Sequence, residues 1–432
     1  MKVDLKNLPK SQIEMLIELD STEWGKFVDR AAKHLAEHVK IDGFRPGAAP
    51  KALVEQKVGM GKILEEAADL AVRKTYGDIV KEKDLEIIGY PEIQVLKVAE
   101  GNPFEFKVKA AMMPAVKLGD YQAAVKKEKI KDKSEIKVEE KEIDESLGWL
   151  QKSRTKFITV NRQAQKGDRV EVDFVAQKEG KTIDGGESKN HPLILGENKF
   201  VPGFEDNLIG MKENEEKKFS LVFPEKYHEP SLASQKIDFE TKVKLVQEAQ
   251  KPELNDEFAK SLGKFEDLPA LKKSIQDGIA MEKQQREKEV WRAKILEGIV
   301  KDSQMDLPDV LVEGELEKMY RELEANVTQM GLTMEKYLEN IKKTKEELLK
   351  EWREKAAERV KSALVLQEIA RQEKIAVSDQ EVEEETNKFL AHYPNIEAVR
   401  SQIDIPRVLD YTRGRLQNEK VFEFLEKIAA NR

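Results

Sequence analysis

"GFRPGAAP", residues 43–50, interrupts a chain that is otherwise rich in charged helical patterns. Two glycines and two prolines among eight residues predict that this stretch neither continues a helix nor pairs along a strand. Apolar residues with helical spacing precede it from Trp24 to Val39, and a second helical pattern follows over residues 51–83. The stretch is therefore predicted to join two helices and to expose Phe44 and Arg45.

Strand patterns lie outside these two helices. Apolar and polar residues alternate in SQIEMLIEL, which ends at Leu19, and again in EIQVLKV and FEFKVKA further along the chain. Asp20 and Glu23 have the spacing of a capping box at the start of the first helix. Residues 1–115 are therefore predicted to form a small α+β domain.

Three further regions follow. Residues 116–153 are predicted to be a charged linker with a short helix, because KKEKIKDKSEIKVEEKE is almost uniformly charged. Residues 154–249 alternate in several segments and predict a mostly antiparallel β domain with one helix. Residues 250–432 predict a long all-α region with thin apolar stripes, in which Ser378 and Glu381 form a second capping box. The fold class is multidomain α+β.

Composition limits the class of protein. The chain has 432 residues, a formal net charge of −8, 37% charged residues and no cysteine. These values favour two to four domains and argue against disulfides, thiolate chemistry and general nucleic-acid binding, so DNA is not an expected partner. Without an apolar leader or a membrane-length apolar run, the expectation is a soluble cytoplasmic protein with no membrane association.

One short motif permits a metal interpretation. HLAEH, from His34 to His38, has the H-x-x-E-H spacing that would place two histidines on one helical face with Glu37 beside them. The competing interpretation is a pair of ordinary surface histidines, and it is favoured because no third ligand is evident. Neither a metal nor a cofactor is expected.

Apolar and aromatic residues near turns mark the β domain. GDRVEVDFVA, GKTIDGG, LILGENKFVPGFEDNLIGM and FPEKYH, in this order, resemble the FK506-binding class of peptidyl-prolyl isomerases. The family usually has Trp where Phe204 stands and often Gly where His228 stands. The residues that this resemblance implies around a substrate proline are Phe174, Ile183, Asp184, Phe200, Val201, Phe204, Tyr227, His228 and Phe239.

The order of all regions resembles the trigger factor family of bacterial ribosome-associated chaperones over essentially the whole chain. LPDVLVEGELEKM in the helical region also resembles that family. The resemblance implies that the 43–50 stretch docks onto a ribosomal protein near the tunnel exit. The guanidinium of Arg45 could bind a carboxylate or an rRNA phosphate through two hydrogen bonds. The implied docking residues are Gly43, Phe44, Arg45, Pro46, Gly47 and Pro50.

The predicted function is that of a ribosome-associated chaperone that binds nascent and unfolded polypeptides and isomerises X–Pro bonds. Three alternatives stay open: a free cytosolic prolyl isomerase-chaperone, a binding-only chaperone with an inactive isomerase fold, and a metalloprotease. KIAVSDQEVEEE also resembles a segment of periplasmic isomerase chaperones. Whether the protein forms a homodimer off the ribosome is left open as well.

Overall fold

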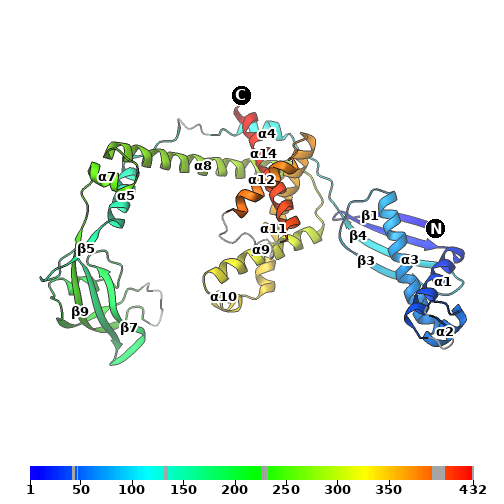
Figure 1. Cartoon of the computed structure of the whole chain (residues 1–432), viewed down its shortest axis with the longest axis horizontal. Helices are drawn as coiled ribbons and strands as arrows, with labels where there is room; N and C mark the ends of the chain where they lie inside the picture. Colours follow the sequence, from blue (N-terminus) through cyan, green and yellow to red (C-terminus); the bar gives the residue numbers. More distant parts are fainter. Residues whose placement is uncertain are drawn as a thin grey trace. The chain divides into compact units, whose positions relative to one another are not determined.

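The structure is a computed structural model that describes residues 1–40, 44–45, 47–130, 135–225, 227, 229, 232–391 and 404–430 (Figure 1). The chain divides into two compact units. The first comprises Met1–Ile130 with Lys288–Arg432, and the second is Lys131–Glu287. The predicted multidomain α+β class is confirmed, since antiparallel sheets occur in both units and long helices follow.

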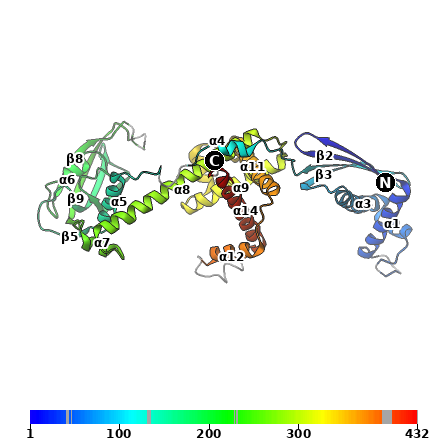
Figure 2. The ribbon, with the colours of Figure 1, turned by 90° about the horizontal axis from the view of Figure 1, so that it is seen from above.

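An antiparallel sheet of four strands opens the first unit, in the order β1-β2-β4-β3. Its elements are β1 (Lys2–Leu8), β2 (Gln12–Leu19), α1 (Ser21–His38), α2 (Lys51–Val58), α3 (Met60–Glu82), β3 (Ile87–Lys97) and β4 (Phe104–Met112). Figures 1 and 2 show α1 and α3 on one face of this sheet, where they bury a common core. The central strand pair has Ile17 opposite Phe106.

Local sequence explains why α1 begins at Ser21. The Asp20 carboxylate accepts the backbone N–H groups of Thr22 and Glu23 at 3.0 and 2.8 Å, and the Glu23 side chain accepts the N–H of Asp20. The predicted capping box is therefore confirmed. The helical pattern over residues 51–83 is in fact two helices, because Gly59 between them has φ +84°, a left-handed conformation that interrupts an α-helix.

The remaining elements described for the first unit are helices. Its helices are α4 (Tyr121–Lys127), the later part of α8 (Leu268–Asp302), α9 (Asp309–Gln329), α10 (Met334–Ile341), α11 (Lys345–Gln372), α12 (Asp379–Leu390) and α14 (Ile405–Ala430). Tyr121 and Val125 of α4 are buried beside Trp291 and Ile369. A short helix within the charged stretch thus contributes to the helical core.

The second unit holds a five-stranded antiparallel sheet in the order β5-β9-β6-β7, with β8 paired to β9. Its elements are α5 (Glu140–Ser153), β5 (Lys156–Thr159), β6 (Arg169–Lys178), β7 (Lys181–Ile194), α6 (Phe204–Leu208), β8 (Glu216–Val222), β9 (Lys236–Gln250), α7 (Asp256–Leu262) and the first part of α8. Alternating residues of β6 and β9, including Val172, Phe174, Phe239 and Val243, are buried against α6. The single short helix α6 covers the inner face of this sheet.

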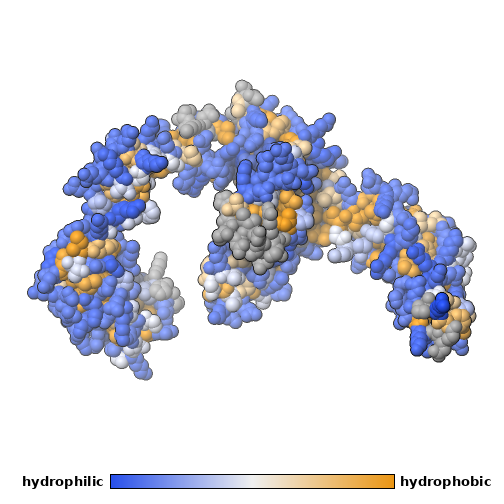
Figure 3. Space-filling model, in the orientation of Figure 1, coloured by the Kyte–Doolittle hydropathy of each residue, from blue (hydrophilic) through white to orange (hydrophobic). Residues whose placement is uncertain are grey.

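Polar residues dominate the visible surface. Figure 3 shows hydrophilic residues over most of the face in view, with smaller hydrophobic patches between them. Among the described residues, none of the helices is both long enough and apolar enough to cross a membrane.

Candidate functional site

Four phenylalanine rings meet between the inner face of the second sheet and α6. Phe204, the first residue of α6, has its ring centroid 4.1 Å from that of Phe200, 5.1 Å from Phe239 and 5.7 Å from Phe174. Most of these rings meet edge to face, the arrangement that aromatic quadrupoles favour. Phe204 is fully buried, so it forms the floor of an aromatic cluster with the other three rings around it.

Partly exposed side chains surround this floor. Ile183, Phe200 and Tyr227 are half-buried and pack against the same core, and Val201 is 8% exposed. We call these four residues the rim. Rim and floor together form one apolar cluster that is partly open to solvent at Ile183, Phe200 and Tyr227.

Two residues predicted for this site are not among those that the structure brings together. Asp184 is exposed on β7, beside Ile183, and it is not a member of the buried core. His228 lies outside the described residues. The structure therefore brings seven of the nine predicted residues together.

Sequence reasoning missed three aromatic neighbours of the site. Phe219 and Phe223 stack with Phe239 at 5.6 and 6.3 Å, and His191 meets Phe174 and Phe200 edge-on at 5.6 and 5.7 Å. The alternation of apolar residues in EEKKFSLVFP could have indicated the two phenylalanines. No local signal distinguishes His191, because its role depends on packing between β7 and the following loop.

A buried carboxylate holds the loop that carries Phe200. Glu205 is 3% exposed, and its two oxygens accept the backbone N–H groups of Gly196, Asn198, Lys199 and Phe200 at 2.7, 2.9, 2.9 and 3.4 Å. Gly196 and Asn198 have φ +92° and +52°, which turns successive N–H groups toward one point. The carboxylate supplies the acceptors that this loop would otherwise lack.

A groove adjoins the cluster across Phe200 and His191. It has a volume of about 360 Å³, and Arg169, Glu197 and Lys199 contribute its charged groups besides Glu205. Glu197 pairs with Lys199 at 2.8 Å and with Lys152 at 3.3 Å. The hydrogen bond from Lys199, more than that from Lys152, lowers the pKa of Glu197.

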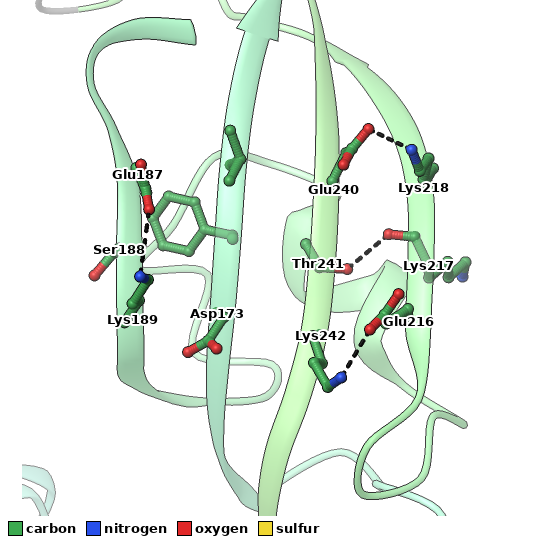
Figure 4. A pocket seen from close by; sticks show the side chains of 12 residues that line it. Asp173, Glu187, Ser188, Lys189, Glu216, Lys217, Lys218, Glu240, Thr241 and Lys242 are labelled. Atoms are coloured by element: carbon green, nitrogen blue, oxygen red, sulfur yellow. Dashed lines mark hydrogen bonds and ion pairs between the residues drawn. The ribbon is translucent and has the colours of Figure 1, made fainter.

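A second hollow of about 360 Å³ lies across β7, β6, β9 and β8 and is strongly charged (Figure 4). The carboxylate of Glu216 accepts from Lys242 at 2.8 Å, which lowers the pKa of Glu216 and raises that of Lys242, and Glu240 pairs with Lys218. Figure 4 shows that these pairs connect β9 with β8. The charged groups thus form ion pairs between neighbouring strands, which stabilise the sheet surface.

The stretch after α1 presents a second candidate site. Phe44 is 43% exposed and Arg45 is exposed, while the N–H of Gly47 donates to the carbonyl of Ala36 at 2.9 Å. Gly47 has φ +79°, and Pro50 precedes the first residue of α2. The described part of the stretch is thus anchored to α1 while its aromatic and cationic side chains face solvent. Gly43 and Pro46 lie outside the described residues.

The HLAEH motif does not assemble a ligand set. The rings of His34 and His38 lie 4.9 Å apart, and Nδ1 of His34 is 2.8 Å from a carboxylate oxygen of Glu66. No group of three His, Cys, Asp or Glu side chains suited to a metal ion occurs within the part of the chain that the structure describes.

Three protein families match successive parts of this chain, in the order of the regions described above. Residues 1–150 match the family described as bacterial trigger factor protein, residues 160–246 match FKBP-type peptidyl-prolyl cis-trans isomerase, and residues 267–427 match the trigger factor C-terminus.

Full-length relatives are similar over almost the whole chain. A trigger factor of Caldicellulosiruptor saccharolyticus is 35% identical over 98% of this chain and 95% of its own, and one of Moorella thermoacetica is 33% identical over 98% and 94%. A solved structure from work on promiscuous substrate recognition in folding and assembly by the trigger factor chaperone has a TM-score of 0.56 and 22% identity, covering 99% of this chain and 100% of that one.

Proposed function

The chain belongs to the trigger factor family, and on that premise we propose how its functions are divided along the sequence. It is a ribosome-associated chaperone with a peptidyl-prolyl isomerase domain of the FKBP type. Residues 1–115 form the ribosome-binding domain, 116–153 the linker, 154–249 the isomerase and 250–432 the region that binds unfolded chains. The protein acts in the cytoplasm, partly on ribosomes.

The aromatic cluster is the isomerase site, and the observation that supports this most strongly is the buried floor ring of Phe204 within its half-buried rim. A proline side chain binds against the rim, between Phe200 and Tyr227, with the buried ring of Phe204 beneath it. Rotation about an X–Pro bond is opposed by amide resonance with a barrier of about 18–20 kcal/mol. An apolar pocket disfavours the charge-separated planar imide more than the twisted one, so it binds the transition state better than the ground state.

No covalent step is needed, and the residues have separate roles. Phe174, Phe204 and Phe239 form the floor, while Ile183, Phe200, Val201 and Tyr227 form the walls. Asp184 and His228 are proposed as the polar residues of the site. The site is tested by measuring kcat/KM for a proline tetrapeptide with the purified full chain; absence of catalysis would favour the binding-only alternative.

Docking to the ribosome is assigned to the stretch after α1. Exposed Phe44 supplies apolar area, and Arg45 can bind a carboxylate of a ribosomal protein or an rRNA phosphate through two parallel hydrogen bonds. The hydrogen bond of Gly47 to Ala36 limits the conformations of the stretch, so less entropy is lost on docking. Gly43, Pro46 and Pro50 are proposed to complete the docking element.

Co-sedimentation with purified bacterial ribosomes tests this assignment. The wild type is expected in the pellet, and a Phe44→Ala/Arg45→Ala variant with an unchanged circular dichroism spectrum is expected in the supernatant. Equal behaviour of the two proteins would overturn the docking role of these side chains and favour the free isomerase-chaperone.

Exposed apolar side chains of the helical region are proposed to contact nascent and unfolded polypeptides. Met330, Phe389 and Tyr411 are 69%, 51% and 68% exposed. Methionine adapts its shape to different partners, which suits a surface that binds many sequences. A homodimer off the ribosome is proposed as the resting form, and sedimentation velocity at several concentrations tests it.

A further inference from the structure

His191 is the imidazole member of a cluster of aromatic rings. Its imidazole meets Phe174 and Phe200 edge-on at 5.6 and 5.7 Å, and both of these rings also contact Phe204. The side chain is half-buried. It therefore lies one ring beyond the floor of the proposed proline pocket.

A β-bulge directs His191 to this place. Val172 pairs with His191 and Phe174 with Ser188, so β7 contains one more residue than β6 between these pairs. Asn190 within the bulge has φ +49°, and its N–H donates to the Asp173 carboxylate at 2.7 Å. Bulges of this kind redirect a side chain, and they are frequent beside active sites.

The hydrogen bonding of the imidazole leaves one nitrogen available. Nδ1 of His191 lies 3.5 Å from the hydroxyl oxygen of Ser188. The neutral ring either accepts from that hydroxyl and carries its hydrogen on Nε2, or donates to it and leaves Nε2 as an acceptor. Nε2 has no hydrogen-bond partner in the part of the chain that the structure describes, so it can form a hydrogen bond with a bound peptide in either tautomer.

The charged groups that line the adjoining groove have partners within the protein. The Arg169 guanidinium donates to Gln247 and Glu171 at 2.9 and 3.3 Å, and Glu197 pairs with two lysines. Glu205 accepts four backbone N–H groups. Each charged lining group is thus already engaged within the protein.

We propose that His191 and this groove form a subsite for a residue next to the substrate proline, and that the subsite favours side chains that form a hydrogen bond with Nε2. The inference rests on the proposed isomerase function of the aromatic cluster. Consecutive Cα atoms are about 3.8 Å apart, so a residue adjacent to a proline on Phe204 reaches the next ring. Glutamine fits this chemistry, whereas methionine has nearly the same length and only a weak acceptor.

Two pairs of proline tetrapeptides test the subsite with the full-length protein. One pair has Gln or Met before the proline, and the other has Gln or Met after it. In one of the two pairs, the wild type is expected to show a higher kcat/KM for the Gln peptide. His191→Phe is expected to reduce this Gln-to-Met ratio about fivefold, the effect of one neutral hydrogen bond, while it still isomerises the Met peptide.

A second variant and a control complete the test. His191→Gln retains a donor and is expected to keep most of the wild-type ratio, while His34→Phe, in the first unit, should leave it unchanged. An equal ratio for wild type and His191→Phe in both pairs would overturn the subsite but leave the isomerase function in place. Failure of the wild type to isomerise any of the four peptides would overturn the isomerase function together with the subsite.

Discussion

The carboxylate of Glu205 and the backbone N–H of Gly196 lie 2.7 Å apart and tie the second residue of α6 to the loop after β7. The same side chain accepts the N–H of Phe200 at 3.4 Å, so the position of the Phe200 ring depends on this carboxylate. A hydrogen bond to a charged group contributes about 1.5–3 kcal/mol, and a donor left unpaired in a buried site costs a similar amount. Glu205 thus positions the wall of the proposed pocket.

Glu205→Gln is expected to lower kcat/KM for prolyl peptides by about tenfold or more. The amide has only one acceptor oxygen, and its NH2 group faces backbone donors, so the loop that carries Phe200 has to shift. The prolyl peptide assay measures the change. Glu215→Gln is the matched control, because that exposed carboxylate accepts a single backbone N–H, from Lys212. Similar losses in both variants would contradict a specific role for Glu205.

Phe204→Leu is expected to reduce isomerase activity by about tenfold or more while ribosome pelleting and suppression of aggregation persist. Leucine removes the ring that contacts Phe174, Phe200 and Phe239, so the substrate proline loses its floor. Phe106→Leu serves as control, since Phe106 is also fully buried but lies in the N-terminal sheet. If Phe106→Leu lost the same isomerase activity, general destabilisation would explain both results.

Much of the local structure was predictable because it depends on neighbours in sequence. The capping boxes at Asp20 and Ser378 form as their spacing indicates, and the alternation around Ile17 produces a strand buried on one face. Strand β1 was missed. Its residues from Lys2 to Leu8 are mostly exposed at the sheet edge, and the apolar alternation is limited to Val3 and Leu5, a short signal for a strand.

Features that depend on distant contacts could not be predicted from local patterns. Tyr121 is buried beside Trp291, and its pKa is raised to about 12, first by burial and then by its hydrogen bond to Glu373. Nothing in the charged stretch around it indicated this packing. The same applies to His191, whose place in the ring cluster results from a bulge and from the loop held by Glu205.

Gly47→Ala is expected to weaken ribosome binding several-fold. An alanine at φ +79° costs about 1–2 kcal/mol, and its Cβ would lie 2.9 Å from Cγ of Glu37, so the stretch that presents Phe44 and Arg45 has to change conformation. Co-sedimentation at several ribosome concentrations measures the affinity. Gly101→Ala imposes similar strain at φ +73° with no atom within 4 Å of the new Cβ, and it should bind like the wild type. Unchanged binding of Gly47→Ala would show that the conformation of the stretch does not limit docking.

Glu381 links α12 to α14 in a way that predicts acid sensitivity. Its carboxylate contacts Nζ of Lys420 at 2.7 Å and accepts the N–H and hydroxyl of Ser378, both at 2.9 Å. These interactions, with the lysine contributing most, lower the pKa of Glu381 from 4.5 to about 2. Since the folded pKa lies below the unfolded one, the stabilisation is fully present above about pH 4.5 and is lost as the pH falls toward 2.

Glu381→Gln should therefore lower the Tm of the helical circular dichroism signal at pH 7, because glutamine cannot form the ion pair with Lys420. The difference from wild type is expected to shrink below about pH 4.5 and to vanish near pH 2, where the wild-type carboxylate becomes protonated. Added salt should reduce the difference at pH 7, as the pair is accessible to solvent. Glu383→Gln, at an exposed position of the same helix, is the control and should show no such pH dependence. A Tm difference that stays constant from pH 7 to pH 2 would mean that the Glu381 carboxylate does not stabilise the contact between α12 and α14.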